Sequence, residues 1–305
     1  MGRELTRRAA PWHQTNWDWR AAANFIGGGT GTGFLLALAV AAALGQASVL
    51  LTVVGLAFIA GGLACVWLEI GRPLRAVNVL INPRTSWMAR EAWVSFFLFA
   101  AGLAAVLSEA NGRAGRGLLW FAASLGLAYL YCQARMVGAS KGIPAWREGM
   151  VVPLIMITGL TEGAGLLAAT LSLFGSAVFW LTIAMLVLPL LRAAVWRSYR
   201  SQIARRGAPV AALQVLDAFD RLFLLYGSLG PAMLGLIALF VPELAPVSLV
   251  VGGLAALAAG WALKHVLITR AGFNQGFALP VLPVRGCGEP GPGVQPGWSR
   301  PKTGT

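Results

Sequence analysis

The stretch "SVLLTVVGLAFIAGGLACVWLE", residues 48–69, decides the fold class of this chain. Its only charged residue is Glu69 at the end, and an apolar run of about 20 residues can cross ~30 Å of hydrocarbon as a helix. Similar runs recur in a chain that is 57% hydrophobic and 11% charged, with a mean hydropathy of +0.71. This composition excludes a soluble protein and predicts an all-α, polytopic membrane protein.

The apolar runs predict a bundle of eight transmembrane helices. They are continuous rather than alternating, which excludes the strands of a β-barrel. We expect a polar N-terminal segment at 1–21, with no apolar core of a signal peptide, then a membrane domain at 22–270 and a Pro/Gly-rich tail at 271–305. The predicted spans are residues 22–45, 48–69, 91–108, 116–136, 150–172, 176–196, 218–240 and 246–269.

Basic residues predict the orientation of the bundle, because Lys and Arg in short loops stay on the cytoplasmic side. They gather before span one and after spans two, four, six and eight, where we also count Arg192 and Lys264. The opposite side carries only Arg113 and Arg116. Both termini are therefore expected in the cytoplasm, with the chain in the inner (cytoplasmic) membrane of a bacterium or archaeon. The net charge of +13 is explained by this topology, by contact with anionic lipid headgroups or by an acidic partner. Nucleic acid binding is not expected.

Cysteines and histidines limit the redox centres that the chain could hold. Cys65, Cys132 and Cys287 are isolated, so we expect no metal site, no intrinsic iron–sulfur cluster and no disulfide framework. His265 is the only histidine within a span, since His13 precedes span one. Haem held by two histidines inside the bundle is therefore not expected.

The glycine-rich stretch "NFIGGGTGTGF", residues 24–34, lacks the preceding strand and the lysine of a phosphate-binding loop. Its glycines predict a helix face that a neighbouring helix or a flat ligand can approach closely. Asn24 lies about one turn inside the bilayer boundary, where its amide needs a partner.

Two acids close the basic loop between spans two and three. In an antiparallel hairpin Glu69 and Glu91 lie at the same depth, and we expect Arg72, Arg75 and Arg90 close to them. One interpretation is solvated ion pairs at the lipid headgroups. The other is a partly buried carboxylate with a tuned pKa that accepts protons near working pH.

Other polar residues are predicted at the same level. Tyr131 and Arg135 are four residues apart on span four and share a helix face. Together with Asn24, the two acids and the loop arginines, they predict an apolar pocket with a few convergent polar groups. Such a pocket suits a quinone, either menaquinone or ubiquinone, with Glu69 and Glu91 exchanging its protons.

Glu162 lies near the middle of span five, where a charge is costly and usually functional. It could be protonated and hydrogen-bonded to Thr161 or to a neighbouring helix. The alternative is a proton relay toward the far side of the membrane.

The motifs "LEIGRPLRAVNVLINPRTSWMARE", residues 68–91, and "ARMVGASKGIPAWREG", residues 134–149, resemble the membrane anchor subunits of molybdopterin oxidoreductases. These are the DmsC-like (dimethyl sulfoxide reductase) and NrfD-like (polysulfide reductase) anchors. The family's loop motif is matched at Gly71, Arg72, Pro73, Ser86, Trp87, Arg90 and Glu91. Glu69 stands where that family usually has histidine, so the resemblance still implies a quinone site but with a different pH dependence.

The resemblance implies that Asn24 and Tyr131 contact the quinone ring and that the anchor holds no cofactor of its own. It also implies two partners on the cytoplasmic side: a four-cluster ferredoxin-like iron–sulfur subunit and a catalytic subunit with molybdenum or tungsten. The chain would then be the membrane subunit of an enzyme whose catalytic centre lies elsewhere. The segments "PWHQTNWDWRAAANF" (11–25) and "AGFNQGFALPVLPVRG" (271–286) resemble anchors of phenylacetyl-CoA:acceptor oxidoreductases.

Two other functions are compatible with eight spans. A secondary transporter would explain an acid within a span, but such proteins often contain inverted repeats, and no convincing repeat is found here. A purely structural anchor would hold the partners without binding quinone.

Overall fold

The computed structural model describes residues 9–69, 73–175, 178–282, 286, 289 and 291–299. Among these residues, eight helices are long and apolar enough to cross a membrane, which confirms the all-α polytopic fold. Most predicted boundaries are within four residues of the observed ones. The main difference is that the sixth span continues to Arg206 and the seventh begins at Val210.

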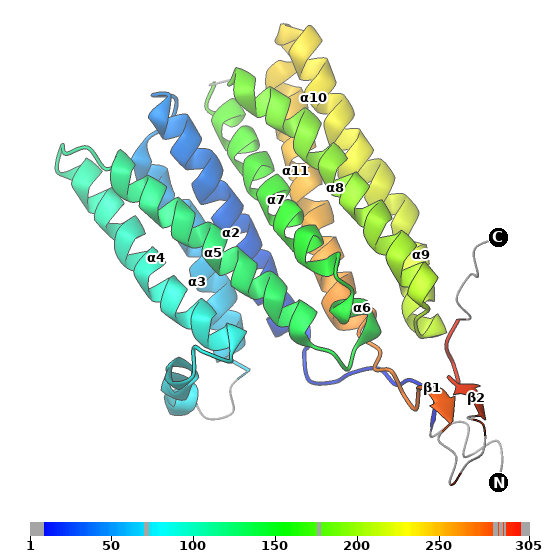
Figure 1. Ribbon diagram of the computed structural model, residues 1–305. Helices are drawn as coiled ribbons and strands as arrows, with labels where there is room; N and C mark the ends of the chain where they lie inside the picture. Colours follow the sequence, from blue (N-terminus) through cyan, green and yellow to red (C-terminus); the bar gives the residue numbers. More distant parts are fainter. Residues whose placement is uncertain are drawn as a thin grey trace.

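The helices carry the labels of Figure 1. Phe223–Leu229 and Val266–Arg270 are π-helical turns inside longer helices. The elements are α2 (Trp19–Ala43), η1 (Val49–Leu51), α3 (Thr52–Trp67), η2 (Pro73–Ile81), α4 (Trp87–Ala110), α5 (Arg116–Ala139), α6 (Pro144–Arg147), α7 (Val151–Leu173), α8 (Phe179–Arg206), α9 (Val210–Leu222), η3 (Phe223–Leu229), α10 (Gly230–Phe240), η4 (Pro242–Leu244), α11 (Ala245–His265), η5 (Val266–Arg270), β1 (Leu279–Leu282) and β2 (Gly291–Val294).

Local sequence signals set several helix ends. Asp18 caps α2 by accepting from the backbone N–H of Arg20, and Ser86 caps α4 by accepting from the N–H of Ala89 at 3.3 Å. Gly207 ends α8 with φ = 76°, a conformation that glycine adopts readily. The cap at Ser86 fixes where α4 begins, and thereby the depth of Glu91 one turn later.

Helix α2 is the centre of the bundle, since it packs against α3, α5, α7 and α11. In Figure 1, α4 and α5 lie on one side of it, and α8 and α10 lie beyond α7 on the other. A Cβ at Gly27 would meet the carbonyl oxygen of Phe58 in α3, and one at Gly33 would meet that of Gly159 in α7. The glycine stretch therefore does what its composition predicts, because it allows two helices to approach α2 at backbone distance.

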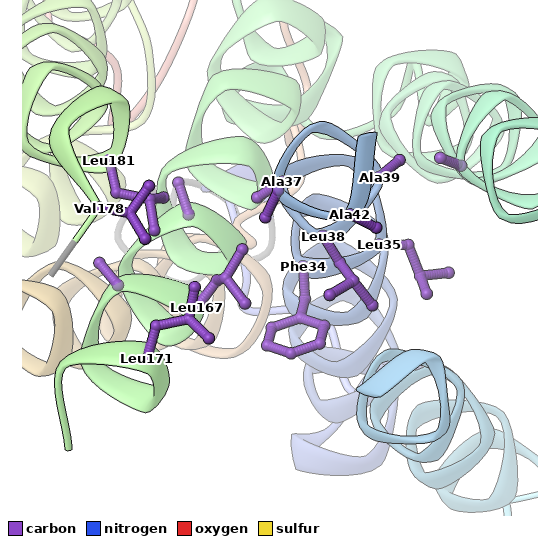
Figure 2. Close-up of a cluster of buried hydrophobic side chains, with 14 of the residues drawn as sticks. Phe34, Leu35, Ala37, Leu38, Ala39, Ala42, Leu167, Leu171, Val178 and Leu181 are labelled. Atoms are coloured by element: carbon purple, nitrogen blue, oxygen red, sulfur yellow. The ribbon is translucent and has the colours of Figure 1, made fainter. Parts of the chain in front are cut away.

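The apolar core joins α2 to α7. Figure 2 shows Phe34 and Leu38 of α2 beside Leu167 and Leu171 of α7, with Leu181 of α8 on the far side of α7. Phe34, Leu38 and Leu167 are completely buried. This packing fixes α2 and α7, the two helices that carry Asn24 and Glu162.

One end of the bundle, here called the basic end, collects η2, α6, the α8–α9 junction, the segment 9–18 and the described residues of the segment 271–299 (Figure 1). The two segments are tied together, since Gln14 N–H donates to the oxygen of Gly272 and Phe277 N–H donates to that of Ala9. Ser299 bonds to Ala208 in the α8–α9 junction. The described part of the tail thus lies along its own chain, with β1 and β2 paired antiparallel.

Candidate functional site

A cavity of about 840 Å³ opens between α2, α3 and α4 toward the basic end. Glu69, Glu91 and Asn24 all line it, which brings together three of the residues singled out in the sequence. Asn16 and Ser95 are the other polar lining residues, and both were missed. The remaining lining is apolar: Trp17, Ala21, Phe25, Leu63, Ala64, Val66, Trp67, Val79, Met88, Ala92 and Met136.

Glu91 lies at the inner side of this cavity, where its side chain is only 4% exposed. Gln133 Nε2 donates to Glu91 Oε1 at 3.0 Å, and Asn24 Nδ2 lies 3.5 Å from the same oxygen. Tyr129 donates from its hydroxyl to Asn24 Oδ1 at 3.5 Å. Glu91 is therefore not a solvated carboxylate, and the polar side chains described around it are neutral amides and a phenol.

Glu69 follows α3 and is more accessible than Glu91. Partial burial raises the pKa of its carboxyl above the ordinary value, and the Asp18 carboxylate adds to the rise. Arg20 opposes both effects. Glu69 is thus placed to hold a proton at a higher pH than a free glutamate.

The predicted tyrosine is replaced by its neighbour. Tyr131 is 39% exposed and rests edge-on against Trp87, with ring centroids 5.7 Å apart, while Tyr129 is fully buried and faces Asn24. Residues two apart on a helix point in nearly opposite directions, so Tyr129 and Gln133 share the inner face of α5. Tyr131 and Arg135 do share a face, as predicted, but it is the outer one.

Two of the predicted arginines, Arg90 and Arg135, do not line the cavity. Arg90 stacks on Trp87, with 4.2 Å from its guanidinium carbon to the ring centroid, and donates to the oxygens of Pro83 and Arg84. Arg135 lies over the same ring at 5.0 Å. Arg72 lies outside the described residues, and Arg75 lies in η2, where its side chain is not described.

A second polar cluster lies deeper, between α2, α7 and α11. Lys264 Nζ forms an ion pair with Glu162 Oε2 at 2.7 Å, and Thr30 donates to the same oxygen at 2.8 Å. Trp261 donates to Thr30 at 2.9 Å. Thr161 instead donates to the oxygen of Ile157, so the hydrogen bonds of Glu162 go to neighbouring helices and not to Thr161.

Two cations counted with the loops are in fact inside the bundle. Lys264 is 1% exposed and Arg192 is completely buried. Arg192 Nη1 donates to the oxygen of Ala256 at 2.9 Å, and Nη2 donates to that of Gly227 in the π-helical turn η3. A π-helical turn changes the backbone hydrogen-bond pattern, and here the side chain of Arg192 bonds to one of its carbonyls.

Comparison with known families identifies the chain. Residues 31–218 match the family described as DMSO reductase anchor subunit (DmsC). This chain belongs to the DmsC family. The family provides the membrane anchor of molybdenum oxidoreductase complexes, in which it associates with molybdopterin catalytic and iron–sulfur subunits. No curated protein matches the chain.

In this DmsC-family chain, Tyr129 and Gln133 were missed because Tyr131 and Arg135 have the same spacing on the opposite face of the helix. In "LAYLYCQAR" a phenol and an amide, Tyr129 and Gln133, are spaced four apart within an apolar helix. The signal for Lys264 is that the apolar residues Val266, Leu267 and Ile268 come after it and extend the span to Arg270, which places the lysine within the helix.

Proposed function

We propose that the chain is the quinone-reactive anchor of its complex, passing electrons between the quinone pool and a docked iron–sulfur subunit. The observation that carries the proposal is one apolar cavity lined by two carboxyls, the buried Glu91 and the more accessible Glu69, and by the amide of Asn24. Its volume lies within the range of small-molecule sites. A quinone head has two carbonyl oxygens, and a quinone supplies a two-electron, two-proton couple.

Each polar residue has a separate task in this proposal. Asn24 donates to a ring carbonyl, while Glu91, held by Gln133, holds and releases a proton at its carboxyl inside the cavity. Glu69 exchanges protons with water at the mouth. The apolar walls, including Phe25, Leu63 and Met88, exclude water from the ring. Arg90, Tyr131 and Arg135 line the outer surface, so we assign them no contact with the ring.

The test uses the purified complex. We expect Glu91→Gln to lower quinone-dependent turnover by at least ~100-fold, in line with the usual contribution of general acid–base groups. Glu69→Gln should lower it less, because this more accessible carboxyl exchanges protons with water at the mouth. Activity of the catalytic subunit with an artificial dye should survive in both variants. Glu243→Gln, an exposed acid at the opposite end, is the control. Unchanged quinone turnover in both site variants would leave only a structural anchor.

We also propose that Glu162 relays protons away from this cavity. Asn24 and Thr30 lie on the same helix, six residues or about 9 Å apart along its axis. Gln133 lies over Gly28, and Lys264 Nζ lies over Gly29, so the two clusters contact adjacent glycines of α2. Glu162 Oε1 and Thr158 Oγ1 have no hydrogen-bond partner among the described residues, and internal water would satisfy them.

Complexes reconstituted in vesicles test the relay. If Glu162 carries protons, Glu162→Gln slows proton appearance on one side of the membrane more than it slows quinone turnover. Equal slowing of both rates would show that Glu162 has a structural role. Thr170→Val, a substitution on the same helix outside this cluster, is the control.

The basic end is proposed to face the cytoplasm, with the partner subunits docked on it. The exposed cations Arg84, Arg147 and Arg205 lie at this end, and the rule that basic loops stay inside supports this orientation. The quinone type, and membership of the phenylacetyl-CoA:acceptor subgroup, stay predictions.

A further inference from the structure

A second groove, of about 460 Å³, lies on the outer side of the bundle between α8 and the α9–η3 helix. Its lining is charged toward the basic end, with Arg197, Asp220 and Arg221. The rest of the lining is apolar and includes Leu224, Leu225 and Leu229. Leu225 and Leu229 are 44% and 49% exposed and follow one another at a spacing of four. The groove therefore has a charged end, here called its mouth, and an apolar remainder.

The mouth lies where the apolar stretches of both helices end. In α8, Arg192 is the only charged residue before Arg197, and it points into the bundle, where it bonds to backbone oxygens of Ala256 and Gly227. In the antiparallel partner helix, the apolar stretch begins at Leu222, directly after Arg221. Both groove arginines thus lie at the boundary between hydrocarbon and headgroups.

The charges at the mouth are arranged to leave cationic groups outermost. Asp220 is only 24% exposed and accepts from Trp196 Nε1 at 2.6 Å and from Arg197 Nη1 at 3.4 Å. The side chain of Arg197 is 65% exposed, and Arg221 is also exposed. The next cation along α8, Arg200, is already paired with Asp217. The positive charge of the two exposed guanidinium groups therefore exceeds the negative charge of the single carboxylate that lines the groove.

We propose that this groove binds one anionic phospholipid, with its phosphate on Arg197 and Arg221 and an acyl chain along Leu225 and Leu229. Guanidinium groups match phosphate oxygens in geometry and charge. Anionic headgroups are also drawn to basic residues at the membrane surface. Asp220 positions Arg197 and limits the affinity, because its carboxylate repels the phosphate. The proposal does not depend on quinone binding in the first cavity.

Delipidated full-length chain and native mass spectrometry provide the test. Phosphatidylglycerol should remain bound with an apparent affinity at least 10-fold higher than that of phosphatidylcholine of the same chain length. Arg197→Gln combined with Arg221→Gln should remove this preference. Arg113→Gln combined with Arg116→Gln, at the opposite end, should leave it unchanged. Equal retention of the two lipids by the unaltered chain overturns the proposal.

A variant with the opposite expected effect guards against simple misfolding. Asp220→Asn can still accept from Trp196 but removes the negative charge, so phosphatidylglycerol should bind a few-fold more tightly. Weaker or unchanged binding contradicts the role assigned to this carboxylate. Glycerol phosphate without acyl chains should compete poorly. If it, or a quinone, displaces the lipid stoichiometrically, the groove is an anion site or a quinone site instead.

Discussion

Gln133 donates to Glu91 across 3.0 Å, from α5 to α4, and the same nitrogen lies 3.1 Å from the backbone oxygen of Asn24 on α2. One amide therefore links the three helices behind the cavity. A Cβ at Gly28 would collide with the Gln133 side chain, so the glycine makes room for this amide. Glu91 depends on this contact because its other amide partner, Asn24, is more distant at 3.5 Å.

Replacing Gln133 by leucine should impair the site without unfolding the bundle. A hydrogen bond to a charged group contributes about 1.5–3 kcal/mol, which corresponds to roughly 10–150-fold in quinol kcat/KM. Steady-state kinetics with a soluble quinol measure it. Gln46→Leu, which removes an exposed bond to Trp180 at the opposite end, should change kcat/KM by less than about threefold. Similar losses in both variants would contradict a specific role for Gln133.

The pH profile of quinone turnover should respond in opposite directions to two substitutions near Glu69. Asp18 raises the pKa of Glu69 and Arg20 lowers it. Asp18→Asn should therefore move the limb of the profile that reports Glu69 to lower pH, and Arg20→Gln should move it to higher pH. Asparagine also caps helices well, so α2 should keep its start. Identical shifts in the two variants would exclude Glu69 as the titrating group.

Removing one partner of the Glu162–Lys264 pair should strongly lower the stability of the folded state. Lys264→Met leaves an unpaired buried carboxylate and should destabilise the folded state by about 3–5 kcal/mol. Combining it with Glu162→Gln should restore much of that loss. Thermal unfolding in detergent measures both variants. A double variant no more stable than Lys264→Met would mean that the two side chains are not energetically coupled.

Adjacent glycines of α3 provide a matched packing test. A Cβ at Gly62 would lie 3.0 Å from the backbone oxygen of Asn24, whereas one at Gly61 meets nothing within 4 Å. Gly61→Ala should be neutral or stabilise the folded state by up to about 1 kcal/mol. Gly62→Ala should destabilise it by about 1–3 kcal/mol. Equal melting temperatures would contradict the tight contact of α2 with α3.

The proposed orientation predicts the accessibility of single cysteines in a variant lacking the native ones. Ser140→Cys, at the basic end, should react with a membrane-permeant thiol reagent and resist an impermeant one in intact cells. Ser48→Cys, at the opposite end, should react with both. The reverse pattern would place the basic end outside the cytoplasm.

The sequence alone predicts the spans well, because their length and hydropathy follow from the thickness of the bilayer. It also predicts that Asn24, Glu69 and Glu91 lie together, since hairpin geometry sets the depth of both acids. The sequence did not predict which helix face points inward, since Tyr131 was assigned to the site and Tyr129 occupies it. Their helix is apolar on both sides, so hydropathy does not distinguish the face toward lipid from the face toward protein.

Buried charge was the other source of error. Arg192 and Lys264 lie near helix ends in the sequence, where cations usually extend to the headgroups. Their partners come from distant parts of the chain: Glu162 for Lys264, and Gly227 and Ala256 for Arg192. The carbonyl of Gly227 is presented by a π-helical turn that no local pattern predicts. Such contacts depend on tertiary packing and cannot be obtained from single-helix reasoning.

The bonds of Gln14 to Gly272 and of Ala9 to Phe277 have a consequence for how the molecule is made. The segment leading into α2 is synthesised more than 250 residues before its partners. The entrance to α2, including the region around Asn16 and Trp17, can therefore close only after α11 has been synthesised. Maturation of the cavity mouth should be among the last steps of assembly, after all eight helices have entered the bilayer.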